Sequence, residues 1–460
     1  MEFLALVMFA CVCIVLLFGY PVALTLAGTS LLFAGVSTLF GAFDSAFLSA
    51  LPSRYYGILT NQTLLAVPLF VFMGMVLERA KIAEELLTSM AQLFGRFRGG
   101  LAISVIFVGM LLAASTGIVG ATVVTMGLLS LPTMLKAGYS PRFSTGVICA
   151  TGTLGQIIPP SIALVLLGDV LSNSYQLAQL KLGNFNPDTI SVGDLFAAAV
   201  LPGLLLVAMY TCYTIFVTLF ASEGVPAPAE SKISEQSKIN WLRLINALVP
   251  PLLLMVLVLG SILAGYATPT EAAGVGAFGA LLLALINGAL TLANLKQVTI
   301  GTMKITSMVF LILIGASLFS LVFRGLGGDE LIHDFFQQLP GGAISAMLIV
   351  MLVIFLLGFI LDFIEITFVV IPIVAPILLM MDINPLWLGI MIAVNLQTSF
   401  LTPPFGFSLF YLRGVADKAI KTGQIYKGVI PFIVMQLLLL AALALWPELV
   451  TWLPELIYSR

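Results

Sequence analysis

The sequence predicts an all-α polytopic membrane protein built as an inverted-topology repeat, with one re-entrant hairpin and one broken helix in each half. Three observations predict this architecture: the chain is 60% hydrophobic and only 9% charged, it contains many long apolar runs, and its halves carry prolines in register. A soluble domain carries about 25% charged residues. No aqueous fold could bury this much apolar surface.

The apolar runs cover most of the 460 residues. Each is about one bilayer crossing or longer, at roughly 20 residues per span. Because lipid offers backbone groups no hydrogen-bonding partners, the runs must be helices. The first run, residues 3–18, lacks the basic region and cleavage site of a signal peptide, so we interpret it as a retained span.

The basic residues predict the orientation of the chain in the membrane. If the N-terminus lies outside, four of the 19 basic residues remain outside, namely Arg54, Lys181, Arg324 and Arg460. The others then face the cytoplasm, as the positive-inside rule requires. We therefore expect a multi-pass protein of the bacterial inner membrane with both termini in the periplasm.

A polar stretch at residues 222–240 reads as a cytoplasmic linker between two repeats, residues 1–221 and 241–460. Four prolines superimpose at an offset of 244 residues: Pro132 on Pro376, Pro141 on Pro385, Pro159 on Pro403 and Pro160 on Pro404. Such self-similarity is the sign of a structural repeat.

Each repeat contains a hairpin followed by a broken helix. The predicted hairpins are residues 101–136 and 346–381, and the predicted broken helices are residues 143–172 and 386–412. Flanking charges place the ends of the first hairpin inside and those of the second outside. Hairpins that enter from opposite faces are typical of secondary transporters. Before each hairpin comes an amphipathic segment, Ala80–Phe97 or Asp329–Leu339, which either lies at the interface or forms an ordinary connecting loop.

The two broken helices open at Ile158-Pro159-Pro160 and Thr402-Pro403-Pro404. Consecutive prolines remove backbone donors and free carbonyls at bilayer depth. These carbonyls need an ion, a water-filled cavity or protein donors, because an unpaired buried group costs several kcal/mol. Hard oxygen ligands suit an alkali cation, and the half-helix N-termini after the breaks would attract a carboxylate. A plain kink satisfied by neighbouring helices is the alternative.

Asp362 and Glu365 lie in the central part of the second hairpin, where an ionisable group indicates function by default. Asp362 could bind a cation or carry a proton, and Glu365 could also pair with a basic group. Glu271 follows Thr268 and Pro269 in the order of a helix start. The single histidine, His333, is interpreted as a surface residue. No catalytic triad, metal cluster or phosphate loop is present in the sequence, so transport energy must come from a gradient.

Four motifs resemble the large membrane subunit of tripartite ATP-independent periplasmic (TRAP) transporters, and the similarity runs through nearly the whole chain. The motifs are LAVPLF at 65–70, GTLGQIIPPS at 152–161, GYATPTEAA at 265–273 and TPPFG at 402–406. The resemblance implies an elevator mechanism, sodium coupling, a small four-helix membrane partner and a periplasmic binding protein that delivers a small carboxylate. It implies neither an enzyme activity, nor a cofactor beyond Na⁺, nor a nucleic-acid partner.

The resemblance also places candidate binding residues. One sodium site would join the first hairpin tip to the first break, and the other would join Asp362 to the second break. The sodium candidates are Ser115, Thr116, Gly117, Gly152, Gly155, Pro159, Asp362, Gln397, Thr398, Ser399, Thr402 and Pro403. The substrate candidates are Ser161, Gln156, Asn395, Pro160, Pro404 and Glu365. No transition metal is expected.

Two departures from the family pattern concern these candidates. Ile118 and Val119 follow Gly117 where many members have small and hydroxyl residues, and Ser399 stands where many have glycine. The segment Leu361–Ile366 is similar to the branch associated with 2-oxoacids, mannitol or chloroaromatic acids.

Two other functions remain open at this point. One is a stand-alone dicarboxylate symporter or antiporter, which would work without a binding protein. The other is a proton-translocating antiporter-like subunit of a respiratory complex. That class carries a chain of Lys, Glu and His across its middle, whereas the spans here have almost no Lys and no His.

Overall fold

The computed structural model describes residues 3–80, 85–90, 99–220 and 241–458. Helices account for all the regular structure in these ranges. The helices that precede the predicted linker are α1 (Leu4–Leu17), α2 (Val22–Leu39), η1 (Ser45–Ala50), α3 (Leu51–Thr60), α4 (Ala66–Arg79), α6 (Gly100–Thr116), α7 (Val119–Lys136), α8 (Pro141–Thr153), η2 (Leu154–Gln156), α9 (Ile162–Lys181) and α10 (Val192–Phe220). The linker itself, residues 222–240, lies outside the described residues.

The helices that follow the linker repeat this pattern. They are α11 (Trp241–Leu263), α12 (Pro269–Ile286), α13 (Leu292–Gly325), α14 (Gly328–Gln337), α15 (Gly342–Leu357), α16 (Phe363–Val369), α17 (Ile371–Met380), α18 (Pro385–Leu401), α19 (Phe407–Val415), α20 (Thr422–Leu445) and α21 (Glu448–Tyr458).

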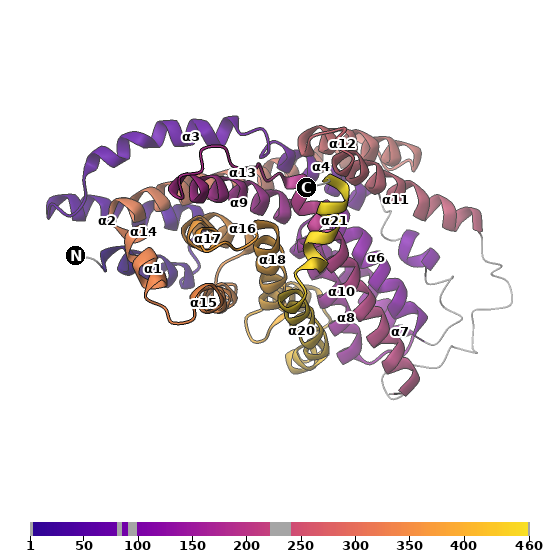
Figure 1. Cartoon of the computed structure of the whole chain (residues 1–460). Coiled ribbons are helices and arrows are strands. Elements are labelled where there is room, and N and C mark those ends of the chain that lie inside the picture. The colour runs from indigo at the N-terminus through magenta and orange to yellow at the C-terminus, as the bar shows by residue number, and fades with distance from the viewer. Residues whose placement is uncertain (1–2, 81–84, 91–98, 221–240, 459–460) are drawn as a thin grey trace.

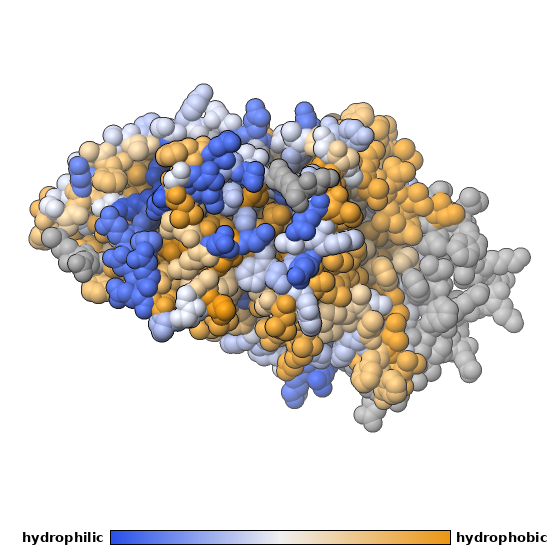
Figure 2. Space-filling model, in the orientation of Figure 1, coloured by the Kyte–Doolittle hydropathy of each residue, from blue (hydrophilic) through white to orange (hydrophobic). Residues whose placement is uncertain are grey.

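The prediction of a polytopic, all-helical membrane protein is confirmed. Among the described residues, six helices are long and apolar enough to span a bilayer, and the bent pair α16–α17 would make a seventh. Five further apolar helices among the described residues are shorter. Three of them, α6, α15 and α18, belong to the predicted hairpins or to an interrupted helix. Figure 2 shows hydrophobic residues over much of the visible surface, with hydrophilic ones gathered where α14 lies. A surface of this kind faces lipid rather than water.

The helices pack in two groups. In the first, α2 and α4 pack along the long helix α13, and α12 packs on α4 (Figure 1). In the second, α8 packs between α7 and α20, and α18 packs on α20 and α15. Contacts between the groups are made chiefly by α4 with α6 and by α13 with α16. The hairpins and the interrupted helices thus lie together, against a wall formed by α4 and α13.

Both predicted hairpins are pairs of helices joined by a tight connection. In the first, α6 and α7 meet at Gly117-Ile118, and Gly117 takes a positive φ of 60° that favours glycine. In the second, α15 is followed by α16 and α17, which are bent by 57° relative to each other. That the hairpins turn back within the bilayer stays a prediction.

The prolines that coincide at the 244-residue offset occupy equivalent places in the helices. Pro141 and Pro385 begin α8 and α18, where the missing N–H would have had no partner. Pro132 and Pro376 lie inside α7 and α17. The Pro-Pro pairs follow η2 and α18, and both peptide bonds between these prolines are cis. The predicted breaks are therefore present, and α9 resumes only at Ile162.

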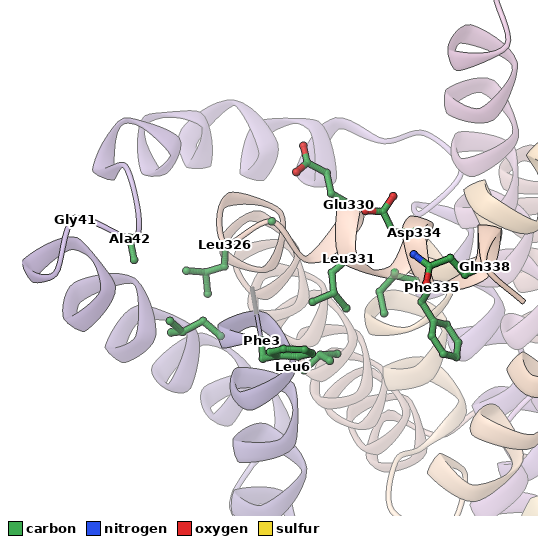
Figure 3. Close-up of a pocket in the computed structure, with 13 residues that line it drawn as sticks. Phe3, Leu6, Gly41, Ala42, Leu326, Glu330, Leu331, Asp334, Phe335 and Gln338 are labelled. Atoms are coloured by element: carbon green, nitrogen blue, oxygen red, sulfur yellow. The ribbon is translucent and has the colours of Figure 1, made fainter. Parts of the chain in front are cut away.

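Of the two predicted amphipathic segments, Asp329–Leu339 forms α14, whereas Ala80–Phe97 falls largely outside the described residues. Figure 3 shows Glu330 and Asp334 on one side of α14, away from Leu331. The prediction that His333 is a surface residue is only partly right, because its ring is half-buried and bonds Gln337 at 2.9 Å.

The interpretation of Glu271 as a helix-start residue is confirmed. Its carboxylate accepts from the backbone nitrogen and the hydroxyl of Thr268, both at 2.8 Å, and the Thr268 hydroxyl in turn caps α12. This reciprocal arrangement is a capping box.

The helices α8 and α20 approach each other more closely than side chains would allow. A Cβ atom at Gly146 would collide with the carbonyl of Gly428, and one at Gly428 would collide with the carbonyl of Arg142. Small residues permit such close backbone contact between membrane helices. The contact joins the first broken helix to a helix of the second repeat.

We expect Gly146→Ala to destabilise the protein, because the added methyl group meets backbone that cannot rotate away. Overpacking of this kind costs about 1–3 kcal/mol. The measurement is the thermal unfolding midpoint of the detergent-purified protein. The control is Gly414→Ala, at a helical glycine where an added Cβ would have no atom within 4 Å. Equal midpoints for the two variants would contradict the packing described here.

Candidate functional site

The tips of both hairpins and the breaks of both interrupted helices meet at one cavity of about 160 Å³. The hairpins contribute Gly117–Gly120 and Asp362–Ile364. The interrupted helices contribute Gln156, Ile162, Ala163, Phe400 and Tyr411, and the wall is completed by Val71 of α4 and by Ile305, Met308 and Val309 of α13. Segments that are far apart in the sequence therefore converge on one point.

The tip of the first hairpin is held by close backbone contacts. A Cβ at Gly74 of α4 would lie 2.7 Å from the Ser115 carbonyl oxygen, and one at Gly117 would lie 2.9 Å from the backbone nitrogen of Ile162. The Ser115 and Thr116 hydroxyls both donate to the carbonyl of Leu112 at 2.9 Å. The tip of the first hairpin therefore lies in close contact with the N-terminus of α9.

At the first break, the chain leaves the α-helix at Thr153 and passes through η2. The Ser161 hydroxyl donates to the Gly155 carbonyl at 2.7 Å and so bridges the break. Gln156 is only 2% exposed, yet neither its amide nitrogen nor its amide oxygen has a hydrogen-bond partner. Buried amide groups are almost always bonded, so both polar atoms of this side chain are available to a ligand in the adjoining cavity.

The tip of the second hairpin is built on a pair of acids. The Asp362 carboxylate accepts from the backbone nitrogen of Phe363 at 2.6 Å, and the Glu365 carboxylate accepts from the backbone nitrogen of Asp362 at 2.9 Å. Together they form a capping box for α16. Glu365 is thus a capping residue, and the predicted pairing with a basic group is absent among the described residues. Asp362 lines the cavity as well.

The second break presents two unpartnered oxygens. The Ser399 hydroxyl has no hydrogen-bond partner and lies against Gly358, whose missing side chain leaves room for it. The amide oxygen of Gln397 is likewise buried without a partner. Asn395, in contrast, donates to the Met351 carbonyl at 2.8 Å. Oxygen atoms that are buried and unpartnered are candidates for cation coordination.

One hydrogen bond joins the two breaks directly. The amide nitrogen of Gln397 donates to the hydroxyl of Thr153 at 3.3 Å. The two residues are 244 positions apart, which is the offset of the repeat. Residues in equivalent places of the two repeats therefore face each other at the centre of the molecule.

The structure brings only part of the predicted site to the cavity. Gly117, Gln156 and Asp362 line it. Thr398 and Thr402 bond carbonyls one turn back in their own chain, as Ser115 and Thr116 do. Among the glycines, Gly152 packs on Val123, and Gly155 lies near the Ala113 carbonyl. Pro159 and Pro160 are buried, Pro403 is half-buried, and the exposed Pro404 accepts a hydrogen bond from Tyr426 at 3.1 Å.

Several lining residues were missed by the sequence reasoning. Tyr411 and the α13 residues Ile305, Met308 and Val309 belong to ordinary apolar helices and give no polar signal. Thr153 carries a signal, since it coincides with Gln397 at the offset of the prolines. Its pairing with Gln397 could have been proposed from the repeat alone.

Two larger cavities lie away from the breaks. One, of about 920 Å³, is bounded by α1, α14 and the residues Gly41 and Ala42, and it contains none of the predicted site residues (Figure 3). The other, of about 610 Å³, lies between α3, α9, α13 and α17. Size alone would favour these cavities, so the smaller one is the candidate site because the predicted hairpins and breaks converge on it.

The fold is similar to that of a solved transporter. The YdaH transporter of Alcanivorax borkumensis superposes with a TM-score of 0.63 at 15% identity, covering 95% of this chain and 98% of the other. At this identity the likeness shows the fold alone.

The sequence is similar to two named TRAP permeases. The C4-dicarboxylate TRAP transporter large permease DctM of Vibrio cholerae is 28% identical, with 95% of each chain covered. The ectoine/5-hydroxyectoine TRAP transporter large permease UehC of Ruegeria pomeroyi is 27% identical, covering 99% of this chain and 100% of the other. The sequence model of the family described as "Tripartite ATP-independent periplasmic transporter, DctM component" matches residues 9–449. Together with the fold, this match over nearly the whole length shows that the chain belongs to the DctM family of TRAP transporter large permease subunits.

Proposed function

We propose that this permease subunit imports a small organic acid by sodium symport, taking the acid from a periplasmic binding protein. The observation that carries the proposal is the set of buried, unpartnered polar atoms at the two helix breaks, on Gln156, Gln397 and Ser399. Gln156 lines the cavity where both hairpin tips meet, and Ser399 lies against Gly358, just before the second tip. Transporter sites of this architecture lie where interrupted helices expose backbone groups.

Sodium coupling is supported by the chemistry of the second break. The Gln397 amide oxygen and the Ser399 hydroxyl are neutral oxygen donors, and Asp362 supplies a carboxylate at the adjoining hairpin tip. Oxygen ligands without thiolate or imidazole suit an alkali cation. We propose that a cation at this break holds the hairpin tip against α18.

Carriage of a carboxylate is supported by the first break. The unpartnered amide of Gln156 can donate to an anion, and the N-terminal end of α9 lies beside it in the cavity. Helix N-termini favour negative groups. The volume of about 160 Å³ is below the roughly 300–1,000 Å³ of drug-sized ligand pockets, which favours a small cargo.

The proposed importer has two partners, a small four-helix membrane subunit and a periplasmic binding protein, and it works in the bacterial inner membrane. Which acid is carried does not follow from similarity. A permease named for C4-dicarboxylate and one named for ectoine are 28% and 27% identical to this chain.

Sodium coupling predicts a specific effect of Asp362→Asn. Asparagine still caps a helix but lacks the charge that attracts a cation. We expect the sodium concentration for half-maximal uptake to rise at least about tenfold, which corresponds to roughly 1.4 kcal/mol of lost binding. Uptake by proteoliposomes that contain the permease, its small subunit and loaded binding protein is measured against sodium. Asp417→Asn is the control, because this exposed carboxylate also accepts from a backbone nitrogen, that of Ala419, in a turn. An unchanged sodium dependence in Asp362→Asn would contradict the proposal that Asp362 contributes to sodium binding.

The proposed role of Gln156 is tested separately. Gln156→Leu keeps the volume of the side chain but removes both hydrogen-bonding groups. We expect the KM for the cargo to rise about tenfold, since a hydrogen bond to a charged group contributes about 1.5–3 kcal/mol, while half-saturation by sodium stays the same. Gln338→Leu, at an exposed position, is the control. A normal KM for Gln156→Leu would remove Gln156 from the cargo site.

Dependence on the binding protein separates this proposal from a stand-alone symporter. In the same proteoliposomes, uptake should fall to background when the binding protein is omitted and return when it is added with cargo. A sodium-dependent uptake that persists without it would favour the stand-alone symporter.

A further inference from the structure

The cavity of about 610 Å³ between α3, α9, α13 and α17 has no role in the function proposed above. Its lining includes several charged and amide side chains. These are Arg54 and Asn61 at α3, Arg324 at the end of α13, and Asp169 and Asn173 of α9. The orientation set by the basic residues places this cavity on the periplasmic side. Its size matches that of typical small-molecule sites.

Of the two arginines at this cavity, only Arg324 has an ion pair within 4 Å among the described residues, with Asp329 at 3.1 Å. The Asp169 carboxylate accepts from the amide of Asn61 at 3.0 Å. Burial and the nearby Arg324 lower the pKa of Arg54, whereas the more distant charge of Asp329 raises it. Two guanidinium groups thus lie near each other, and no carboxylate among the described residues contacts Arg54 directly.

The same face of α13 lines this cavity and the one at the helix breaks. Ile305, Met308 and Val309 face the breaks, and Leu313, Ala316, Ser317, Ser320 and Arg324 continue at three- and four-residue spacing into the larger cavity. Residues spaced in this way share one side of a helix. Met308 and Ser317 are nine positions apart, or about 14 Å along the axis at 1.5 Å per residue. A molecule in the larger cavity is therefore in line with the proposed cargo site.

We propose that the larger cavity is an oxyanion-binding site, in which a carboxylate or phosphate group lies against Arg54 and Arg324. Arginine presents a planar fork that matches both groups. A free organic acid and the headgroup of an anionic lipid offer the same chemistry. If the occupant is the organic acid, the site is where cargo waits on the periplasmic side; this part rests on the proposed function, whereas the oxyanion site itself does not.

The positive field of the cavity is tested with charged thiol reagents. The four native cysteines are replaced by alanine, and Ser317→Cys or Ser174→Cys is introduced into the lining. The modification rate by a sulfonate-bearing methanethiosulfonate is compared with that by a trimethylammonium-bearing one, each relative to its rate at the exposed control Asn186→Cys. We expect the anionic reagent to be favoured about tenfold, within the range of electrostatic focusing in clefts.

The preference should fall toward unity when Arg54→Gln is added. It should persist when Lys181→Gln is added, because Lys181 is an outer cation that does not line the cavity. A preference unaffected by Arg54→Gln, or cysteines that react with neither reagent, would overturn the proposal.

The source of the anion is decided by protection. Succinate is titrated against the Ser317→Cys variant in phosphatidylcholine vesicles, and a parallel sample contains phosphatidylglycerol without succinate. Slower modification with succinate identifies a free carboxylate as the ligand, and slower modification with phosphatidylglycerol identifies a lipid headgroup. Protection by either anion supports the oxyanion site if the protection is lost in the Arg54→Gln variant. If neither succinate nor phosphatidylglycerol slows the modification, the oxyanion site is refuted. If uptake proves independent of sodium while protection is observed, only the proposed function is contradicted and the oxyanion site is not.

Discussion

The hydrogen bond between Gln397 and Thr153 lies where two interrupted helices meet, and the arrangement around it follows from one constraint. A helix that stops inside a membrane leaves carbonyls and amides that no solvent can reach. Here they are bonded by local hydroxyls such as Ser161 and Thr402 or are buried against the hairpin tips. Among the buried side-chain atoms that have no hydrogen-bond partner, those of Gln156, Gln397 and Ser399 lie at the two interrupted helices.

Much of this arrangement could be predicted from the sequence, because proline and charge act locally. Two consecutive prolines weaken a helix but do not always interrupt it, since Pro250 and Pro251 lie inside the continuous helix α11. The breaks were predicted because Pro159-Pro160 and Pro403-Pro404 coincide at the 244-residue offset. Asp362 and Glu365 led to the prediction that the second hairpin tip is part of the site. Their mutual capping could also have been foreseen, since an acid at the N-cap followed three positions later by glutamate is the pattern of a capping box.

The rest depends on contacts between distant segments. Tyr411 and the α13 residues at the smaller cavity, Ile305, Met308 and Val309, are aromatic or apolar like the helices around them. Only packing therefore shows that they line the cavity. The short helix α3 lies between two apolar runs and was not predicted as an element, and its Arg54 was counted only as a charge that sets orientation. The arginine pair at the far cavity arises because α3 and the end of α13 come together, which no local pattern encodes.

The glycine contact between α8 and α20 has a mechanical consequence. Where the backbones of two helices touch, no side chain can change its conformation to let them slide, so we expect α8 and α20 to move together. The Arg142 side chain adds a hydrogen bond to the Lys427 carbonyl at 3.2 Å. The same α20 holds the second break through Tyr426 and the Pro404 carbonyl. Helix α20 thus contacts the helix that precedes the first break and the backbone of the second break. If parts of the molecule move during transport, this close contact would favour a displacement where α4 and α13 meet the hairpins over one between the two breaks.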